Sequence, residues 1–477
     1  MISAPSHQLL LSGNKTTTAM LLMVALFTIL SCSSAKAVYR PTTTSKVKVQ
    51  KEKEETPMII DTVEWELVSE TEMPPIKNEE ADLMMDKRDS YRVAMFVPLE
   101  SDRPDIQSLL INEYSAANRF ISFYAGAVMA MDDLEREGVN LRVDVYDSQR
   151  SIDKVVSDLS TDVFRNVDAI IGPYGSSRNK EGLKEVAKYG KENEVTVVSP
   201  WYASKSITEE NPYFIQLRPN LDDYYRKMLT HAKANFSNDE IVLLGRAQSA
   251  DPRRQRADES RIQNLQRMHR EIEENDYAAD LNVFTLNTDS LQYADIAYDS
   301  LFWETGRKAI ILPYYSSADE SFVYNSLRRM NGEKGLEPVH VYTMPMAYES
   351  DKIEFNMYRN LSMKICRSKF VDKSEPEVLQ FERNYFNRYG AIPSDDAYQG
   401  YDVMKFVGES LEEYGRNFQF FLEGSRRYLQ SSFDIKPLVN QGKTDQMIDD
   451  RMTELDYFVN KHLDIIEFTD TTFERRD

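Results

Sequence analysis

Short apolar runs alternate with amphipathic stretches from residue 91 onward. The runs are rich in Val, Ile and aromatic residues, which predicts strands. Between them, apolar residues recur at the spacing of a helix face. The predicted strands are 91–99, 141–147, 167–173 and 195–200, and the predicted helices are 120–138, 151–166 and 179–193. Strands that alternate with helices of this length predict right-handed crossovers and a parallel sheet covered on both faces.

The same alternation starts again further along the chain. The predicted strands there are 240–245, 281–287, 308–315 and 339–345, and the predicted helices are 259–275, 321–332, 377–390 and 396–415. Because each series of strands and helices can form its own covered sheet, we expect an α/β protein with two Rossmann-like lobes.

The N-terminus carries an apolar run over 19–30, "AMLLMVALFTIL", which is too short to span a bilayer and is typical of a signal peptide core. Ile29-Leu30-Ser31-Cys32 follows and resembles a bacterial lipobox. The resemblance implies a signal peptide over 1–31, acylation of Cys32 with fatty acids such as palmitate, and anchoring in a membrane. Ser33 and Ser34 follow without an acidic residue, which by resemblance to sorting rules suggests the outer membrane, facing the periplasm. The alternative is a secretory signal cleaved near Ala35 or Ala37.

Residues 32–88 lack sustained periodicity and are rich in Thr, Lys, Glu and Pro. Such a segment buries too little apolar surface to offset its chain entropy, so we expect a disordered tether. Within it, the alternating pattern of 58–68 is compatible with a short strand on a partner surface.

Charge and composition exclude several function classes. The chain has 477 residues and a net charge of -20, which argues against nucleic acid as a partner. The five histidines are scattered without a zinc-ligand spacing, and neither a phosphate loop nor a GxSxG elbow occurs, so we expect no metal, no cofactor and no enzyme. Cys366 is expected to be a small buried apolar residue.

Several motifs carry a family resemblance in their order and spacing. They are "FYAGAVMAMDDLEREGVNLRVDVYDSQ", "AIIGPYGSS", "VTVVSPWYAS", "PYFIQLRPN", "AIILPYYSSADESFVYNSLRR" and "FERNYFNRYGAIPSDDAYQGYDVMKFVGESLEEYG". Together they resemble the type I periplasmic binding proteins of the leucine/isoleucine/valine-binding kind, over about residues 90 to 470. The resemblance implies two lobes joined by three crossover segments and closing on a small polar ligand, amino acid-like or peptide-like. The expected lobe boundaries are 89–217 and 346–425 for lobe 1, and 218–345 and 426–477 for lobe 2.

The strand ends supply the candidate ligand-binding residues. The turn with Ser176 and Ser177 leads into a helix whose first N–H groups favour an anionic group. The next strand ends at the segment of Trp201, Tyr202 and Ser204, and the ends of parallel strands are where open α/β sheets place ligands. The resemblance adds Tyr314 and Tyr315 as an aromatic pair lining the cleft in lobe 2.

The same residues have a structural interpretation. Ser is a preferred helix cap, so Ser176 and Ser177 fit that role equally well. Trp201 stands where the family has a small residue, and Trp201 and Tyr202 are compatible with packing between the lobes. Two functions therefore stay open: capture of a small ligand for amino acid transport, or a structural or regulatory lipoprotein that touches an envelope protein partner and has no ligand.

Overall fold

A computed structural model describes residues 85–101, 116–175, 180–204, 206–247, 251–286, 297–302, 306–439 and 455–476. All of them belong to the larger of two units, 55–477. The predicted signal peptide, Cys32, the strand at 58–68 and the tether up to residue 84 lie outside the described residues, and so do Ser176 and Ser177.

The first sheet has eight strands in the order β11-β12-β13-β5-β4-β3-β1-β2, and we call this sheet and its helices lobe 1. The strands are β1 (Tyr91–Val97), β2 (Leu141–Asp147), β3 (Ala169–Ile171), β4 (Thr196–Ser199), β5 (Phe214–Gln216), β11 (Ser425–Arg427), β12 (Ser432–Val439) and β13 (Leu455–Asn460). The helices are α3 (Ala116–Arg136), α4 (Ile152–Leu159), α5 (Glu181–Asn193), α12 (Pro376–Tyr389) and α13 (Asp395–Tyr414), with 3-10 turns at η1 (Asp162–Asn166) and η3 (Phe418–Phe420).

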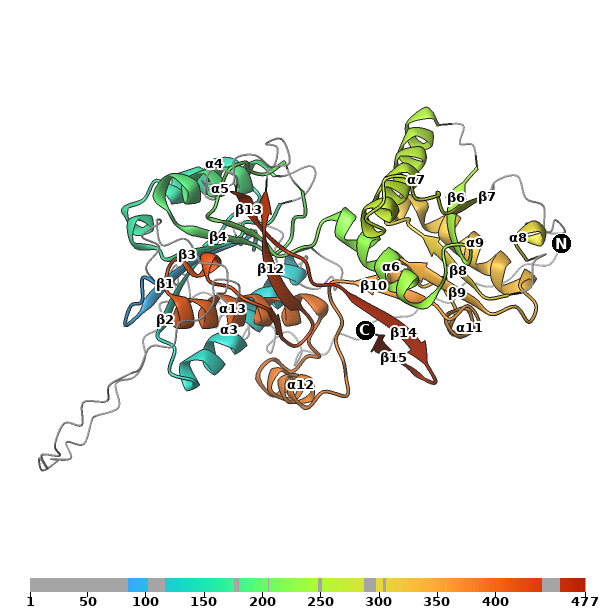
Figure 1. The fold of residues 1–477 in the computed structure, drawn as a ribbon. Coiled ribbons are helices and arrows are strands. Elements are labelled where there is room, and N and C mark those ends of the chain that lie inside the picture. The colour runs from blue at the N-terminus through green and yellow to red at the C-terminus, as the bar shows by residue number, and fades with distance from the viewer. Residues whose placement is uncertain are drawn as a thin grey trace, which may run out of the picture. The chain divides into compact units, whose positions relative to one another are not determined.

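Helices cover both faces of this sheet because its strands are apolar on both sides. Val93 and Met95 of β1 pack with α3 and α13, whereas Ala94 and Phe96 of the same strand pack with α4 and α5. In Figure 1, α4 and α5 accordingly lie on one face and α3 and α13 on the other.

The second sheet has seven strands in the order β15-β14-β10-β9-β8-β6-β7, and we call it and its helices lobe 2. The strands are β6 (Ile241–Arg246), β7 (Asn282–Leu286), β8 (Lys308–Leu312), β9 (Val339–Thr343), β10 (Lys364–Arg367), β14 (Asp464–Thr469) and β15 (Thr472–Arg476). The helices are α6 (Leu221–Asn235), α7 (Pro252–Ile272), α8 (Asp299–Phe302), α9 (Glu320–Glu333), α10 (Met346–Glu349) and α11 (Phe355–Asn360), with a 3-10 turn at η2 (Ser317–Asp319). One apolar core joins the sheet to α6 and α7, and another joins it to α9 and α11.

The α/β prediction with two lobes and parallel sheets is confirmed, and antiparallel strands extend each sheet at one edge. β12 pairs antiparallel with β11 and β13, and β14 pairs antiparallel with β10 and β15. The five C-terminal strands were not predicted. Cys366 is fully buried, as expected.

Strand pairing also differs from the expected lobe boundaries. β10 belongs to the sheet of lobe 2, whereas β12 and β13 belong to that of lobe 1. The chain therefore passes between the lobes three times: after β5, after β10 and after β13. Residues 86–88, expected in the tether, already contact lobe 1, because the Arg416 N–H donates to the Asp86 carbonyl oxygen at 3.1 Å.

Two glycines let α3 and α13 cross in close contact. A Cβ on Gly126 would lie 1.8 Å from the Ala397 carbonyl oxygen, and one on Gly400 would lie 1.8 Å from that of Phe123. No side chain fits at either place, so the approach of the two helices requires glycine on both.

Candidate functional site

The first candidate site lies at the carboxyl ends of β3 and β4 in lobe 1. β3 runs into Gly172, whose φ is +85° and whose Cβ would meet the Phe96 carbonyl oxygen at 2.6 Å and the Trp201 ring at 3.1 Å. Glycine is required here because the backbone is left-handed and its neighbours leave no room for a side chain. The space beside Gly172 is thus taken by the chain's own Trp201.

Trp201 follows β4 and is packed among aromatic rings. Its indole lies 4.7 Å from the Phe123 ring, 5.8 Å from Phe120 and 6.0 Å from Tyr174, between centroids. Only 6% of the residue is exposed. We call Phe120, Phe123, Tyr174 and Trp201 the aromatic cluster; it belongs to the core that β1 shares with α3 and α13.

The backbone around Trp201 is held by polar side chains from other elements. Gln399 of α13 donates to the Pro200 carbonyl oxygen at 2.9 Å, and Arg218 donates to that of Trp201 at 3.2 Å. The Trp201 indole N–H, in contrast, is buried and has no hydrogen-bond partner among the described residues.

The other candidates in lobe 1 lie apart from this core. Tyr202 packs on the opposite face of the sheet, against the core of α4 and α5. The Ser204 hydroxyl is hydrogen-bonded to that of Ser206 at 2.9 Å, and the Ser204 N–H donates to the Gln216 side chain at 3.1 Å. The structure therefore does not bring Trp201, Tyr202 and Ser204 to one point.

Arg150 lies at the border of the aromatic cluster. The Arg150 guanidinium lies 5.7 Å from the Phe120 ring centre and 5.8 Å from that of Tyr174, and it pairs with Glu100 at 3.1 Å. Cations over aromatic faces are attracted by the ring quadrupole, so Arg150 adds to the order of the cluster.

The second candidate site lies at the ends of β6 and β8 in lobe 2, where Tyr314 and Tyr315 differ sharply. Tyr314 is buried, and its hydroxyl accepts a hydrogen bond from the Arg246 N–H at 2.7 Å. Burial raises the pKa of Tyr314 to about 12. Tyr315 is 51% exposed. Of the two, Tyr315 is therefore the one whose ring is accessible at the surface.

Four charged side chains surround Tyr314, and we call them the charge quartet. Arg246 pairs with Asp319 at 2.5 Å and Asp258 at 3.5 Å, while Arg261 pairs with Asp258 at 2.6 Å. The Arg261 guanidinium also lies 4.4 Å from the centre of the Tyr314 ring. All four side chains are buried, so their charges are balanced within the protein.

The quartet was not predicted from the sequence. Asp258 and Arg261 lie on α7, where a charged pair is ordinarily a solvated face, and Arg246 and Asp319 are far from them along the chain. The only local signal was Arg246 itself, at the end of an apolar strand.

Among the described residues, no group of three or more His, Cys, Asp or Glu side chains is placed to hold a metal ion. None of the described helices combines the length and the apolar character needed to cross a membrane.

Comparison with known proteins gives a fold likeness at low sequence identity. No family model and no curated protein matches the chain. A protein of Rhodospirillum rubrum, proposed to be a branched-chain amino acid ABC transporter, is similar at 12% identity and a TM-score of 0.52, over 81% of this chain and 100% of that one. An ABC transporter substrate-binding protein of Desulfitobacterium hafniense in complex with Leu gives 12% identity and a TM-score of 0.47, over 81% and 100%. LpoA of Haemophilus influenzae gives 9% and 0.48, over 82% of this chain and 59% of that one.

Proposed function

We propose that this chain, which has the fold of type I periplasmic binding proteins, acts in the bacterial envelope by contacting a protein partner with its outer surface, and not by enclosing a small ligand between its lobes. It is then a structural or regulatory lipoprotein and not an enzyme. The observation that carries the proposal is the burial of Trp201 in the aromatic cluster, at the strand end where open α/β sheets bind ligands.

Filled strand ends in both lobes support this function. In lobe 1 the aromatic cluster occupies the position, and in lobe 2 the charge quartet surrounds Tyr314 with side chains that form ion pairs with one another. A ligand would have to displace packed rings or break buried ion pairs, and breaking a buried pair costs about 3–5 kcal/mol.

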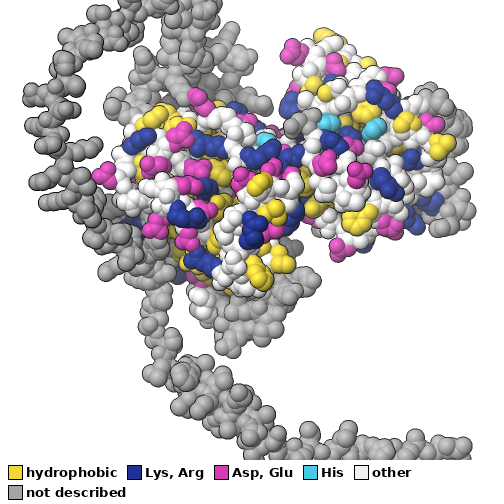
Figure 2. All heavy atoms as spheres, turned by 90° about the horizontal axis from the view of Figure 1, so that it is seen from below, with side chains coloured by type: hydrophobic (Ala, Val, Ile, Leu, Met, Phe, Trp, Pro, Cys, Tyr) yellow, Lys and Arg dark blue, Asp and Glu magenta, His cyan; other side chains and the backbone are white. Residues whose placement is uncertain are grey.

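A surface for a partner is available on α12. Large hydrophobic side chains are exposed there, with Phe386 at 55% and Ile392, just beyond the helix, at 79%. Leu379 and Tyr389 lie on the same side of the helix as Phe386, at helical spacing. We call these four residues the α12 surface. On the face seen in Figure 2, acidic and basic side chains are mixed, which agrees with a protein partner better than with nucleic acid.

The first experiment measures the contribution of Trp201 to stability and to ligand binding. Trp201→Ala should lower the free energy of unfolding by about 3–5 kcal/mol, as the loss of a packed aromatic ring does, and Trp201→Phe should lower it less. Any amino acid or peptide that binds the protein should keep its affinity in Trp201→Phe and in Tyr315→Ala. A ligand that binds tenfold more weakly in either variant would contradict the proposal.

The second experiment tests the partner surface in cells. A photo-crosslinking residue in place of Phe386 should form a discrete adduct with an envelope protein, and Ile392→Asp should abolish that adduct. The same residue in place of Tyr277, which is exposed on lobe 2, is the control and should give no adduct. Adducts of equal yield at both positions would show that the α12 surface is not specific.

A second candidate function is capture of an amino acid-like or peptide-like ligand by lobe closure. The buried and unpaired Trp201 indole N–H favours it, because a donor without a partner in the protein suits an acceptor on a ligand. In that case Ser176, Ser177, Trp201, Tyr202, Ser204, Tyr314 and Tyr315 are the proposed binding residues. Binding that weakens in Trp201→Phe, as tested above, would favour this candidate.

Anchoring by lipid at Cys32 completes the proposed function and rests on the lipobox-like segment 29–32. Cys32→Ala should abolish labelling by radioactive palmitate and move the protein from the membrane fraction to the soluble fraction. We propose the outer membrane, with the domain facing the periplasm, and protease treatment of intact cells should leave the protein uncut. Labelling that persists in Cys32→Ala would rule out this anchor.

A further inference from the structure

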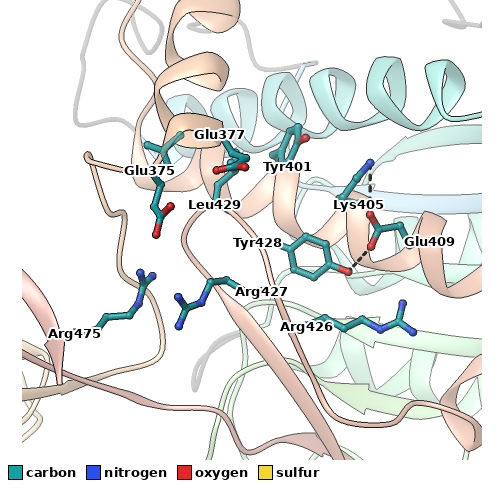
Figure 3. A pocket seen from close by; sticks show the side chains of 11 residues that line it. Glu375, Glu377, Tyr401, Lys405, Glu409, Arg426, Arg427, Tyr428, Leu429 and Arg475 are labelled. Carbon is teal, nitrogen blue, oxygen red and sulfur yellow. Dashed lines mark hydrogen bonds and ion pairs between the residues drawn. The ribbon is translucent and has the colours of Figure 1, made fainter. Parts of the chain in front are cut away.

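A cavity of about 630 Å³ lies among α12, α13 and β11 of lobe 1, with Arg475 of β15 in lobe 2 also in its wall, away from the strand ends considered above. Its volume falls in the range of small-molecule sites, which is about 300–1,000 Å³. Eleven residues line it: Glu375, Glu377, Val378, Tyr401, Lys405, Glu409, Arg426, Arg427, Tyr428, Leu429 and Arg475. The cavity wall combines aromatic and apolar side chains with charges of both signs, as Figure 3 shows.

The apolar part of the wall is held rigid by hydrogen bonds at its edge. The Tyr428 hydroxyl donates to Glu409 at 2.8 Å, and that of Tyr401 donates to Asp133 at 2.6 Å. Lys405 pairs with Glu409 at 3.5 Å. The two rings therefore face the cavity in fixed positions, which lowers the entropy cost of placing a ligand side chain against them.

Other cations of the wall are engaged within the protein. Arg426 pairs with Glu413 at 2.6 Å, and Arg475 pairs with Asp464 at 3.3 Å and donates to the Phe370 carbonyl oxygen at 3.0 Å. These contacts satisfy Arg426 and Arg475 without a ligand.

Three other charged side chains of the wall are not engaged in this way. The side chains of Glu375, Glu377 and Arg427 form no hydrogen bond or ion pair with any described residue, and Arg427 has only a longer-range electrostatic interaction, with Asp372. Glu375 and Glu377 come from the start of α12, and Arg427 comes from β11. In Figure 3 the Glu375 carboxylate points toward the side of the cavity where the guanidinium groups of Arg475 and Arg427 lie, and it is paired with neither.

We propose that this cavity binds a zwitterionic amino acid or short peptide with an apolar side chain. Arg427 takes the carboxylate, Glu375 with Glu377 takes the ammonium group, and the side chain lies against Tyr401 and Tyr428. A guanidinium matches a carboxylate with two parallel hydrogen bonds, and a carboxylate accepts from an ammonium group. The site does not depend on the proposed function, since none of these residues belongs to the aromatic cluster, the charge quartet or the α12 surface.

The test is calorimetric titration of the full mature chain in detergent with the dipeptide Leu-Phe and with free phenylalanine. At least one of them should bind, and the tighter of the two shows whether the site prefers a peptide or a free amino acid. Arg427→Ala and Glu375→Gln should each weaken binding by about tenfold or more, because each removes a hydrogen bond between charged groups, which is stronger than one between neutral groups. Arg427→Lys keeps the positive charge but lacks the planar guanidinium, so its affinity should lie between that of the unchanged chain and that of Arg427→Ala.

Blocked peptides assign each end of the ligand. N-acetyl-Leu-Phe lacks the ammonium group, so Glu375→Gln should weaken its binding no further, whereas Arg427→Ala still should. Leu-Phe amide lacks the carboxylate, so Arg427→Ala should weaken its binding no further, whereas Glu375→Gln still should. If both blocked peptides bind as tightly as Leu-Phe, the assignment is overturned.

Matched controls lie on lobe 2. Arg359→Ala and Glu354→Gln remove one exposed charge of each sign at α11 and should leave binding unchanged. Melting temperatures within a few degrees of the unchanged chain show that each variant is folded. The absence of binding by both probes at millimolar concentration, or equal weakening by the control and cavity variants, would refute the site.

Discussion

Asp402 of α13 is a buried carboxyl group that fastens the turn between β11 and β12. It accepts hydrogen bonds from the N–H groups of Leu429 at 3.0 Å, Gln430 at 3.1 Å and Ser431 at 2.8 Å. Burial raises the pKa of Asp402 to about 7, although the three backbone hydrogen bonds act in the other direction. The same turn positions Tyr428 and Leu429 in the cavity wall, so this residue connects the core to the proposed ligand site.

The raised pKa of Asp402 predicts a pH dependence of stability. Between about pH 4 and pH 7 the folded chain keeps the proton that the unfolded chain releases, so the free energy of unfolding falls as the pH rises through this window. Asp402→Asn carries no charge and should lose this contribution. Urea unfolding at several pH values should show a steeper fall for the unchanged chain, by at most about 1.4 kcal/mol per pH unit. Parallel pH curves would show that Asp402 is ionised in the folded chain.

Single residues were the hardest level to predict from the sequence. The packing interpretation of Trp201 placed it between the lobes, whereas the structure places it in the core of lobe 1. Its three aromatic partners come from α3 and from the turn after β3, which no local pattern connects. The free charges of Glu375 and Arg427 look like ordinary surface residues in the sequence. Their role depends on two elements that meet only in the fold.

Among the elements, the contact of α3 with α13 depends on Gly126 and Gly400, where a side chain has no space. The two helices share an apolar core with β1. Glycine inside a helix ordinarily costs about 1 kcal/mol relative to Ala, so its presence at this crossing shows that close packing outweighs helix propensity.

This crossing predicts opposite outcomes for two Gly→Ala substitutions. Gly400→Ala would place a Cβ 1.8 Å from the Phe123 carbonyl oxygen, so the helices must separate, and we expect a loss of about 3 kcal/mol or more in the free energy of unfolding. Gly332→Ala in α9 meets nothing within 4 Å and should be neutral or stabilising by up to about 1 kcal/mol. Thermal and urea unfolding measure both. Similar effects at the two positions would contradict the role of close packing.

Most helices and parallel strands could be predicted because their apolar spacing is a local property. The long helices α7, α12 and α13 were recognised. The structure starts α7 at Pro252 instead of residue 259, and the other helix ends lie close to the predicted ones. The strands β11 to β15 were missed, since β13 pairs with β5 and β14 with β10, both far away along the chain. Long-range pairing of this kind leaves no periodic signal in a short window.

At the scale of the whole molecule, two of the three passages between the lobes are tied to one another. Asn460, at the end of β13, donates to the carbonyl oxygens of Leu217 at 3.1 Å and Ser432 at 3.0 Å. Lys461 pairs with Asp223 of α6 at 2.7 Å. The passage after β13 is thus fastened to the passage after β5. The resemblance implied three such passages, but the residues at which they occur follow only from the strand pairing.

The start of the folded chain gives the last prediction. Arg88 pairs with Asp168 at 2.7 Å, and the Asp168 side chain is only 4% exposed. Asp86 meanwhile accepts from the Arg416 N–H. A soluble chain beginning at Asp86 should unfold as cooperatively as one beginning after Cys32, because a disordered tether buries little apolar surface.

A chain beginning at Asp89 should be less stable by about 1–3 kcal/mol, since the Asp168 carboxylate loses the Arg88 hydrogen bond and, within the described ranges, keeps only Arg416, at 3.3 Å, as a cationic partner. Arg88→Ala in the longer chain is the matched variant and should reproduce most of this loss in urea unfolding. If the chains beginning at Asp86 and Asp89 are equally stable, residues 86–88 add nothing to the fold. If the chain beginning at Asp86 already unfolds without cooperativity, the segment before it takes part in folding and is more than a tether.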